Sequence, residues 1–389
     1  MEYKPLGSMV NRKIGYGIVQ PGQSVPDGVP VIKVNNLISG LKSPSELDTT
    51  ARENEAKYSR TRLHGGELIV SVVGTIGKTA IVPKSFAGCN LVRATALIDI
   101  EDELMSKWVK YYFDSPCGQS YIEQNLNTTV QPTLNIKSLV EMPIPIRDTT
   151  EMEKTVLLLS ALDEKIEVNR QINDNLLEQM QAIYKSWFVD YLPFGGAMPE
   201  SWTKTGIYSL ANIIYGAPFA SKQFNTEGSG KPIIRIRDLK DQQFATYTTE
   251  VHPKGYLLRP GDIVVGMDGE FRPYIWGNDE AWLNQRVCVF ENKRPKGKAF
   301  LYFTIKPLLY AIEQTQVATT VIHIGKKDYD AFEIMLPDAA TLDSFDSLTA
   351  PMIMRIVSNS FENKRLAVMR DALLPKLMSG EIDVSAVHL

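Results

Sequence analysis

The sequence predicts an α/β (α+β) chain in which one unit, a strand-rich globular block followed by a long helix, occurs twice. Short β-branched runs bounded by Gly, Pro or Asn occur in both halves and are typical of strands. Segments of the first half recur in the same order about 190 residues later. Each half also ends in a long heptad pattern. We therefore expect two similar globular domains with twisted or barrel-like sheets, separated by a long antiparallel two-helix coiled coil.

The internal repeat is carried by weak similarities at nearly the same offset. GGELIVSVVGTIG (65–77) resembles PGDIVVGMDGEFR (260–272), and NTTVQPTLNI (127–136) resembles ATTVIHIGKK (318–327). Several such matches in one order indicate a duplicated unit more strongly than any single match. The chain should therefore divide into a first block, a central helix, a second block and a C-terminal helix, at 1–148, 149–191, 192–347 and 348–389.

Each predicted helix carries a pair of asparagines where the heptad pattern calls for apolar residues. These are Asn169 and Asn173 in the first helix and Asn359 and Asn363 in the second. A buried Asn costs stability, but it fixes the register when it meets another Asn across an interface. In an antiparallel pair, a slip by one turn would leave polar groups unpaired at roughly 1–3 kcal/mol each. We interpret the asparagines as a register lock; the alternative is two unrelated amphipathic helices with solvated Asn.

The composition is that of a globular protein, with 44% hydrophobic and 22% charged residues. No apolar run reaches the roughly 18 residues of a membrane span, and no signal peptide is apparent, so we expect a cytoplasmic protein without a membrane partner. Its three cysteines are widely spaced and predict neither disulfides nor a zinc site. The net charge is −3, yet residues 1–100 hold 12 Lys/Arg against 8 Asp/Glu, and residues 201–307 hold 15 against 10. Two basic blocks are compatible with nucleic-acid binding, although chance variation of the surface is the alternative.

Catalytic motifs are incomplete throughout the chain. GTIGKT (74–79) lacks the first glycine of a phosphate-binding loop, because Val72 stands five residues before Gly77. The four histidines show no metal or triad spacing, and LDEK (162–165) places its charged groups at successive helix positions, where they cannot converge. We therefore expect no catalytic residue, no metal and no cofactor in this chain.

The predicted helix pair is long enough to act as a spacer. A seam of about 35 residues corresponds to ~50 Å at 1.5 Å per residue. Duplex DNA rises ~3.4 Å per base pair, so this length covers about 15 base pairs. Two similar basic blocks on such a rod would suit two half-sites with a fixed gap, and the target would be asymmetric because the copies differ.

The helices also carry a family resemblance. LLSALDEKIEVNRQINDNLLEQMQAIYKSWFVDY (158–191) resembles the central conserved region of the specificity (S) subunit of type I restriction–modification enzymes, and ENKRLAVMRDALLPKLMSGEIDV (362–384) resembles the second conserved region. YKPLGSMV (3–10) and WTKTGIYSLANIIYG (202–216) resemble the starts of the two target recognition domains of that family. The resemblance covers essentially the whole chain and implies that the two blocks are target recognition domains.

The resemblance implies a non-catalytic subunit that binds double-stranded DNA. Two modification subunits would dock on the conserved helices, bind S-adenosylmethionine and methylate adenine, and restriction subunits would use ATP and Mg on their own chains. Trp187, Phe188 and Tyr191 are expected to be exposed beside the seam and to dock a partner. The alternative is a two-headed coiled-coil scaffold that binds proteins without DNA readout; a fused restriction enzyme is disfavoured by the missing motifs.

The turns after the central hairpins are the predicted DNA readers. Arg and Lys can pair with guanine, carboxylates with cytosine, and Asn or Gln with adenine. The recurring Thr-Thr pairs could bind phosphates or bases, or could cap turns inside the fold. Arg235 and Arg237 alternate with isoleucine, which predicts one strand face that contacts phosphate or solvent. The candidate DNA-binding residues are Thr75, Lys78, Arg93, Thr128, Thr129, Arg235, Arg237, Asp268, Arg272, Asn284, Gln285, Arg286, Thr319 and Thr320.

Overall fold

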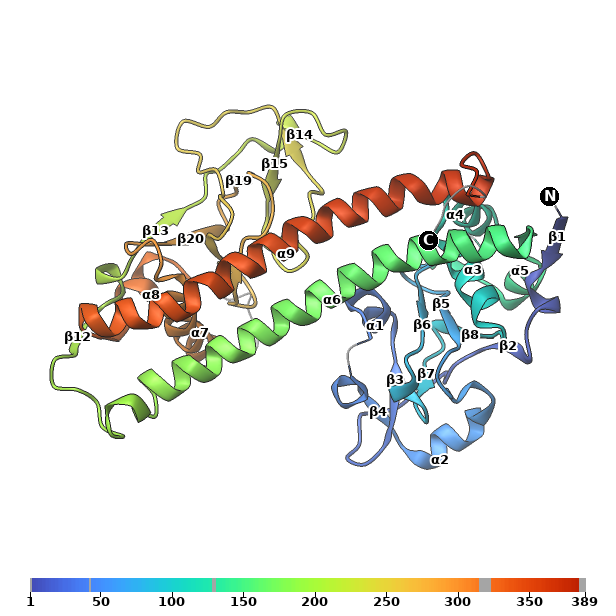
Figure 1. Cartoon of the computed structure of the whole chain (residues 1–389), viewed down its shortest axis with the longest axis horizontal. Helices are drawn as coiled ribbons and strands as arrows, with labels where there is room; N and C mark the ends of the chain where they lie inside the picture. The colour runs from blue at the N-terminus through green and yellow to red at the C-terminus, as the bar shows by residue number, and fades with distance from the viewer. Residues whose placement is uncertain (1, 42, 128–130, 315–322, 385–389) are drawn as a thin grey trace. The chain divides into compact units, whose positions relative to one another are not determined.

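The computed structural model describes residues 2–41, 43–127, 131–314 and 323–384, and it divides into two compact units (Figure 1). The first unit comprises Met1–Asp163 and Val368–Leu389, and the second comprises Glu164–Ala367. Two long helices, α6 (Thr149–Phe188) and α9 (Ala339–Ser379), contribute residues to both units. Each unit is therefore a globular block together with one stretch of each helix.

The block of the first unit is built on small sheets with the strand orders β2-β8-β5-β6 and β4-β3-β7, and on the pairs β1-β11 and β9-β10. β3 and β7 run parallel, whereas the other pairs are antiparallel. The elements are β1 (Glu2–Pro5), β2 (Arg12–Tyr16), β3 (Val29–Ile32), α1 (Val34–Ser39), β4 (Thr49–Thr50), α2 (Arg52–Glu55), β5 (Leu68–Ser71), β6 (Thr79–Ile81), β7 (Asn90–Leu91), β8 (Thr95–Asp99), α3 (Glu103–Asp114), α4 (Pro116–Gln124), β9 (Leu126–Asn127), β10 (Thr133–Leu134), α5 (Ile136–Glu141) and β11 (Pro143–Ile146).

The block of the second unit repeats this plan. Its sheets have the orders β13-β20-β17-β18 and β14-β16-β15-β19, with β15 and β19 parallel, and β12 pairs with β21. The elements are β12 (Thr203–Gly206), β13 (Ala211–Tyr215), β14 (Phe224–Asn225), β15 (Lys231–Ile234), β16 (Tyr247–Thr248), β17 (Ile263–Gly266), β18 (Pro273–Ile275), β19 (Trp282–Leu283), β20 (Val287–Asn292), α7 (Lys298–Gln314), α8 (Lys326–Asp330) and β21 (Glu333–Leu336).

The internal repeat predicted from the sequence is confirmed at the level of strand pairing. Single bridges outside the strands also recur, because the pairing of Val73 with Thr133 matches the pairing of Asp268 with His323. The sheets, expected to be twisted or barrel-like, do not close into a barrel, since the described strands form separate sheets of two to four strands. In each sheet the described strands follow a linear order, and no pairing joins the two edge strands into a closed ring.

The long helices differ from the expected ranges at their ends. α9 begins at Ala339 instead of residue 348, because the Asp338 carboxylate caps it: the backbone N of Thr341 donates to Asp338 Oδ1 at 2.9 Å. α6 ends at Phe188 instead of residue 191. The chain turns away at Tyr191, whose φ of 55° lies in the left-handed region and cannot continue a helix.

Apolar residues of both helices belong to the cores of the two units. In the first unit, Met152 and Leu159 of α6 and Leu377 of α9 join a core that contains the fully buried Trp108. In the second unit, the residues of α6 and α9 in the main core are Met180, Leu342, Phe345, Ile353 and Ile356. Burial of such side chains stabilises a fold by roughly 1.5–3 kcal/mol each. The helix stretches therefore form an integral part of each unit and hold its block in place.

Candidate nucleic-acid interface and helix pair

The helices α6 and α9 run antiparallel, and the four seam asparagines meet within the second unit (Figure 1). Asn169 Nδ2 donates to Asn363 Oδ1 at 2.9 Å, and Asn359 Nδ2 donates to Asn173 Oδ1 at 2.8 Å. The internal repeat relates these two hydrogen bonds, because Asn169 and Asn359 occupy equivalent positions. The contacts needed for a register lock are thus present, and their effect on register is a prediction tested below.

Two amide oxygens in this layer have no hydrogen-bond partner among the described residues. They are Oδ1 of Asn169 and Oδ1 of Asn359, whose side chains are 0% and 1% exposed. An unpaired buried polar atom costs free energy, so these asparagines are not the choice that maximises the stability of the seam. We therefore interpret the layer as a device for pairing specificity and not for stability.

A second polar layer crosses the helix pair in the first unit. Asp163 of α6 accepts from Arg370 Nη1 of α9 at 2.8 Å and from the Tyr111 hydroxyl of α3 at 2.9 Å. The Lys110 ammonium lies 3.5 Å from Asp163 Oδ2. Burial raises the pKa of Asp163, but Lys110 and the hydrogen bond from Arg370 outweigh burial and hold this pKa below its usual 3.8. Burial also raises the pKa of Tyr111, so its hydroxyl stays protonated and donates.

The predicted DNA readers of the first block that are described lie exposed on short connections. Thr75 and Lys78 lie in the turn between β5 and β6, and Arg93 lies between β7 and β8. Ser71 fixes the hairpin turn, because its Oγ donates to the Thr75 carbonyl at 2.6 Å and accepts from the Lys78 backbone N at 2.8 Å. These connections therefore present polar side chains from an ordered backbone.

The equivalent region of the second block gathers three charged or titratable side chains. Asp268 Oδ1 lies 2.7 Å from His323 Nδ1, and Arg286 Nη1 lies 3.1 Å from the same His323 nitrogen. Arg286 is also 3.6 Å from Asp268 Oδ1 and remains 55% exposed. The sequence analysis found no role for His323, because it is 55 residues from Asp268 and 37 from Arg286. The sequence alignment of the repeat places His323 opposite Pro132, and only the bridge pairing in the structure makes His323 equivalent to Thr133.

Three arginines of the candidate set are arranged differently from the expectation. Arg272 is not a free reader, because its guanidinium forms an ion pair with Glu313 of α7. Arg235 and Arg237 do not share a strand face: β15 ends at Ile234, and a 3₁₀ turn follows. Arg235 Nη2 donates to Thr246 Oγ1 at 2.6 Å, whereas Arg237 is exposed.

The remaining candidates lie on one turn or outside the described residues. Asn284 is half-buried, and its Oδ1 accepts from the Gln285 backbone N at 2.7 Å, so Asn284 caps the turn that exposes Gln285. Four threonine candidates lie outside the described residues: Thr128, Thr129, Thr319 and Thr320.

The three aromatic residues expected to be exposed are half-buried, so that expectation is wrong. The Phe188 ring lies 4.9 Å from the ring of Phe345 on α9, and the Trp187 ring lies 5.9 Å from the same ring. The Tyr191 ring lies 5.7 Å from that of Trp202, which follows the helix in sequence. These aromatic residues therefore fasten the end of α6 inside the second unit, and the structure gives no support for docking through them.

The described residues contain no cluster of three or more His, Cys, Asp or Glu side chains that could bind a metal ion. No described helix is both long and apolar enough to cross a membrane. Cys288 is fully buried, and burial raises its pKa to about 12, so it is a poor nucleophile at neutral pH.

Comparisons with known proteins agree with this architecture. A family model described as "Type I restriction modification DNA specificity domain" matches residues 2–178 and 199–352. The EcoBI specificity subunit of Escherichia coli is 38% identical over 142 residues, which cover 36% of this chain and only 30% of that protein. The MjaIX specificity subunit of Methanocaldococcus jannaschii is 24% identical over 305 residues, covering 73% of this chain and 71% of that protein. The crystal structure of an S subunit from M. genitalium shares the fold, with a TM-score of 0.52 at 16% identity, over 96% of this chain and 95% of that one.

Proposed function

The chain belongs to the family of type I restriction modification DNA specificity domains, and we propose that it reads an asymmetric, bipartite sequence in duplex DNA. Each block would read one half-site, and α6 and α9 would set the gap between the half-sites. The chain would carry no catalytic residue of its own. Two modification subunits would bring S-adenosylmethionine for adenine methylation, and restriction subunits would bring ATP and Mg, all in the cytoplasm.

One observation carries the proposal: the two blocks share one fold but have different side chains at equivalent positions of that fold. The bridge between Val73 and Thr133 in the first block corresponds to the bridge between Asp268 and His323 in the second. Bases are distinguished in the major groove by their patterns of donors and acceptors. The first block has Thr133 where the second block has His323, and Val73, which packs against the core, where the second block has the carboxylate of Asp268. This difference in donors and acceptors supports the proposal that the two blocks read different half-sites.

The exposed residues on the short connections are the proposed contacts to base edges. Arg286 offers guanidinium donors that suit the O6 and N7 acceptors of guanine, and Arg93 offers the same group in the first block. Asp268 is only 25% exposed and lies against His323, and its carboxylate could accept from cytosine N4 at the edge of this turn. Lys78 and Arg237, which are exposed and cationic, suit the phosphate backbone.

Selection from a randomised duplex library, with the chain assembled on its modification subunit, tests the proposal. We expect the selected duplexes to share two short, different segments separated by a constant number of base pairs. Binding should weaken with rising salt, because phosphate contacts release counterions. Uniform, sequence-independent recovery from a stable complex would contradict the proposal and favour a scaffold that binds proteins without DNA readout.

A further inference from the structure

A groove of about 370 Å³ lies within the second unit, between the block and α9. One wall is formed by Pro260 and Pro295 on two turns of the block, and the other by Ile353, Met354 and Val357 of α9. Met354 is 65% exposed. The groove thus presents an apolar floor to solvent, and no other part of the described structure covers that methionine.

A lysine without a partner stands at this groove. A Cβ atom placed on Gly261 would lie 2.6 Å from the Lys298 ammonium, so the ammonium rests against the bare backbone of the turn. Lys298 makes no hydrogen bond or ion pair with the described residues. Burial lowers the pKa of Lys298, and the negative charge of Asp262 only partly offsets this effect. Asp262 Oδ2 already accepts from the Arg259 backbone N and from the Tyr256 hydroxyl. Lys298 is also the first residue of α7, where the helix dipole disfavours a cation.

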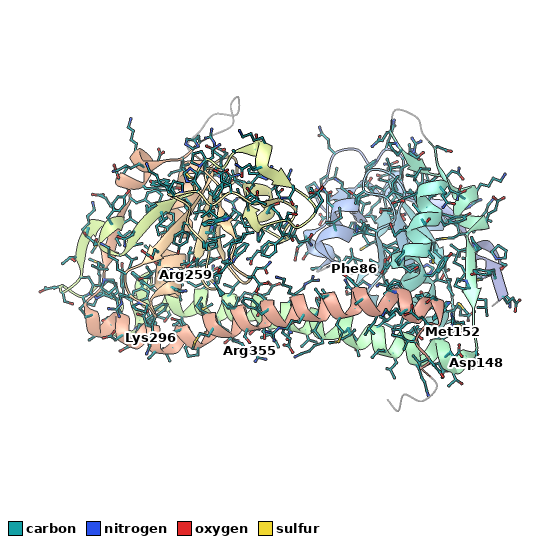
Figure 2. The ribbon with its side chains drawn as sticks, turned by 90° about the horizontal axis from the view of Figure 1, so that it is seen from above. Phe86, Asp148, Met152, Arg259, Lys296 and Arg355 are labelled. Atoms are coloured by element: carbon teal, nitrogen blue, oxygen red, sulfur yellow. The ribbon has the colours of Figure 1, made fainter. Side chains whose placement is uncertain are left out.

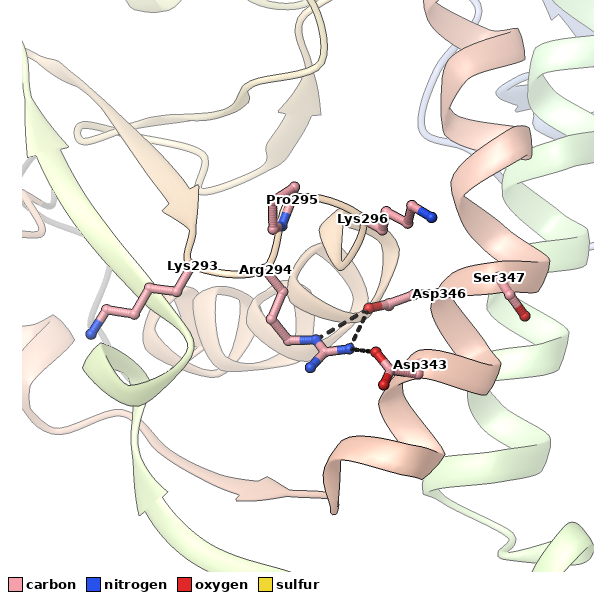
Figure 3. Close-up of a pocket in the computed structure, with 7 residues that line it drawn as sticks. All are labelled: Lys293, Arg294, Pro295, Lys296, Asp343, Asp346 and Ser347. Atoms are coloured by element: carbon pink, nitrogen blue, oxygen red, sulfur yellow. Dashed lines mark hydrogen bonds and ion pairs between the residues drawn. The ribbon is translucent and has the colours of Figure 1, made fainter.

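The rim of the groove is basic. Lys296 and Arg259 are exposed in the second unit, and neither side chain forms an ion pair with the described residues (Figure 2). The described lining of the groove contains Lys296 and Lys298 and no Asp or Glu. The nearby Asp343 and Asp346 share one arginine, Arg294, at 2.6 and 3.0 Å (Figure 3). The net charge offered to a ligand is therefore positive.

We propose that this groove docks an acidic amphipathic segment of a protein subunit that assembles with the chain. An apolar side chain of that segment would cover Met354, and its carboxylates would pair with Lys298 and Lys296. The apolar floor argues against DNA, whose backbone presents only charged oxygens to such a surface. The equivalent helix start in the first unit is Glu103, capped by Asp102, so the basic site belongs to the second copy alone. Naming the partner as a subunit of the methylating complex rests on the proposed function.

The test measures assembly of the full chain with purified modification subunit, without DNA. We expect Met354→Asp and Lys298→Glu each to weaken assembly at least tenfold, and the effect of Lys298→Glu to shrink at high salt, which screens the repulsion. Val251→Asp and Lys327→Glu are the matched controls, because both positions are exposed in the same unit away from the groove, and they should assemble like the wild type. A photo-crosslinking amino acid at position 354 should capture a segment of the modification subunit in which Asp or Glu flanks apolar residues.

Two results would overturn the inference on its own. One is equal assembly of the groove variants, the control variants and the wild type. The other is crosslinking from position 354 to a basic segment, or to duplex DNA added to the complex. If the wild-type chain does not assemble with the modification subunit at all, both the inference and the proposed partner are overturned. If the wild type assembles but the groove variants assemble equally well, only the inference is overturned.

Discussion

Replacing one seam asparagine should lower the free energy of unfolding more than replacing both members of a pair that is hydrogen-bonded across the seam. Asn359 is 1% exposed, its Nδ2 donates only to Asn173, and its Oδ1 has no described partner. Asn173→Leu would therefore leave the Asn359 amide wholly unpaired, at a cost of roughly 1–3 kcal/mol. Asn359→Leu should cost less, about 1 kcal/mol, because Asn173 is half-buried and water can replace its lost partner.

The double variant should recover most of this loss, because two leucines would pack across the seam with no polar group left unpaired. The coupling between the two substitutions should then be about 1–3 kcal/mol. Urea unfolding followed by tryptophan fluorescence measures it, since four of the five tryptophans lie in the second unit. A double variant whose loss equals the sum of the two single losses would refute the argument that these asparagines satisfy each other.

Three further predictions concern other parts of the molecule. Gly277→Ala should destabilise the second unit by roughly 1–3 kcal/mol, because the new Cβ would lie 2.6 Å from Ser360 Cβ on α9; in a Ser360→Gly background calorimetry should show a much smaller loss. Arg286→Ala in the assembled complex should weaken recognition of one half-site by about 1–3 kcal/mol, and Arg93→Ala should weaken recognition of the other half-site. Binding measured across a set of duplex sequences tests both variants. Loss of recognition at one and the same half-site in both variants would contradict the account. The pKa of Asp163 is lower in the folded state than its usual 3.8, so its stabilising contribution is present above pH 3.8 and is lost as the pH falls through the folded pKa. Asp163→Asn should therefore reduce the loss of stability of the first unit as the pH falls below 3.8, and an acid-unfolding profile identical to that of the wild type would contradict a stabilising role for this carboxylate.

The repeat and the helix pair were predictable because they depend on periodic patterns in the sequence. The asparagine pairs were found because they break a heptad at equivalent places, and the structure brings Asn169 to Asn363 and Asn359 to Asn173. The open sheets were not predictable, because sheet closure depends on strand length and pairing, which short β-branched runs do not specify.

The candidate contacts were less predictable because side-chain partners come from distant parts of the chain. Arg272 resembles a free reader in sequence, yet Glu313, 41 residues later, binds its guanidinium. Trp187 and Phe188 were expected to be exposed, but Phe345 and Trp202 cover them in the folded unit. These contacts join residues that are well separated in the sequence, so the sequence did not indicate them. The groove at Lys298 is formed by turns and a helix that no local motif connects.

The most direct test of the account is single-molecule sequencing of adenine methylation in cells that express this chain with its modification subunit. The account predicts one bipartite motif with a fixed gap, two different half-sites and one methylated adenine on each strand. No new methylation despite a stable assembled complex would contradict the account, as would methylation at a single continuous site.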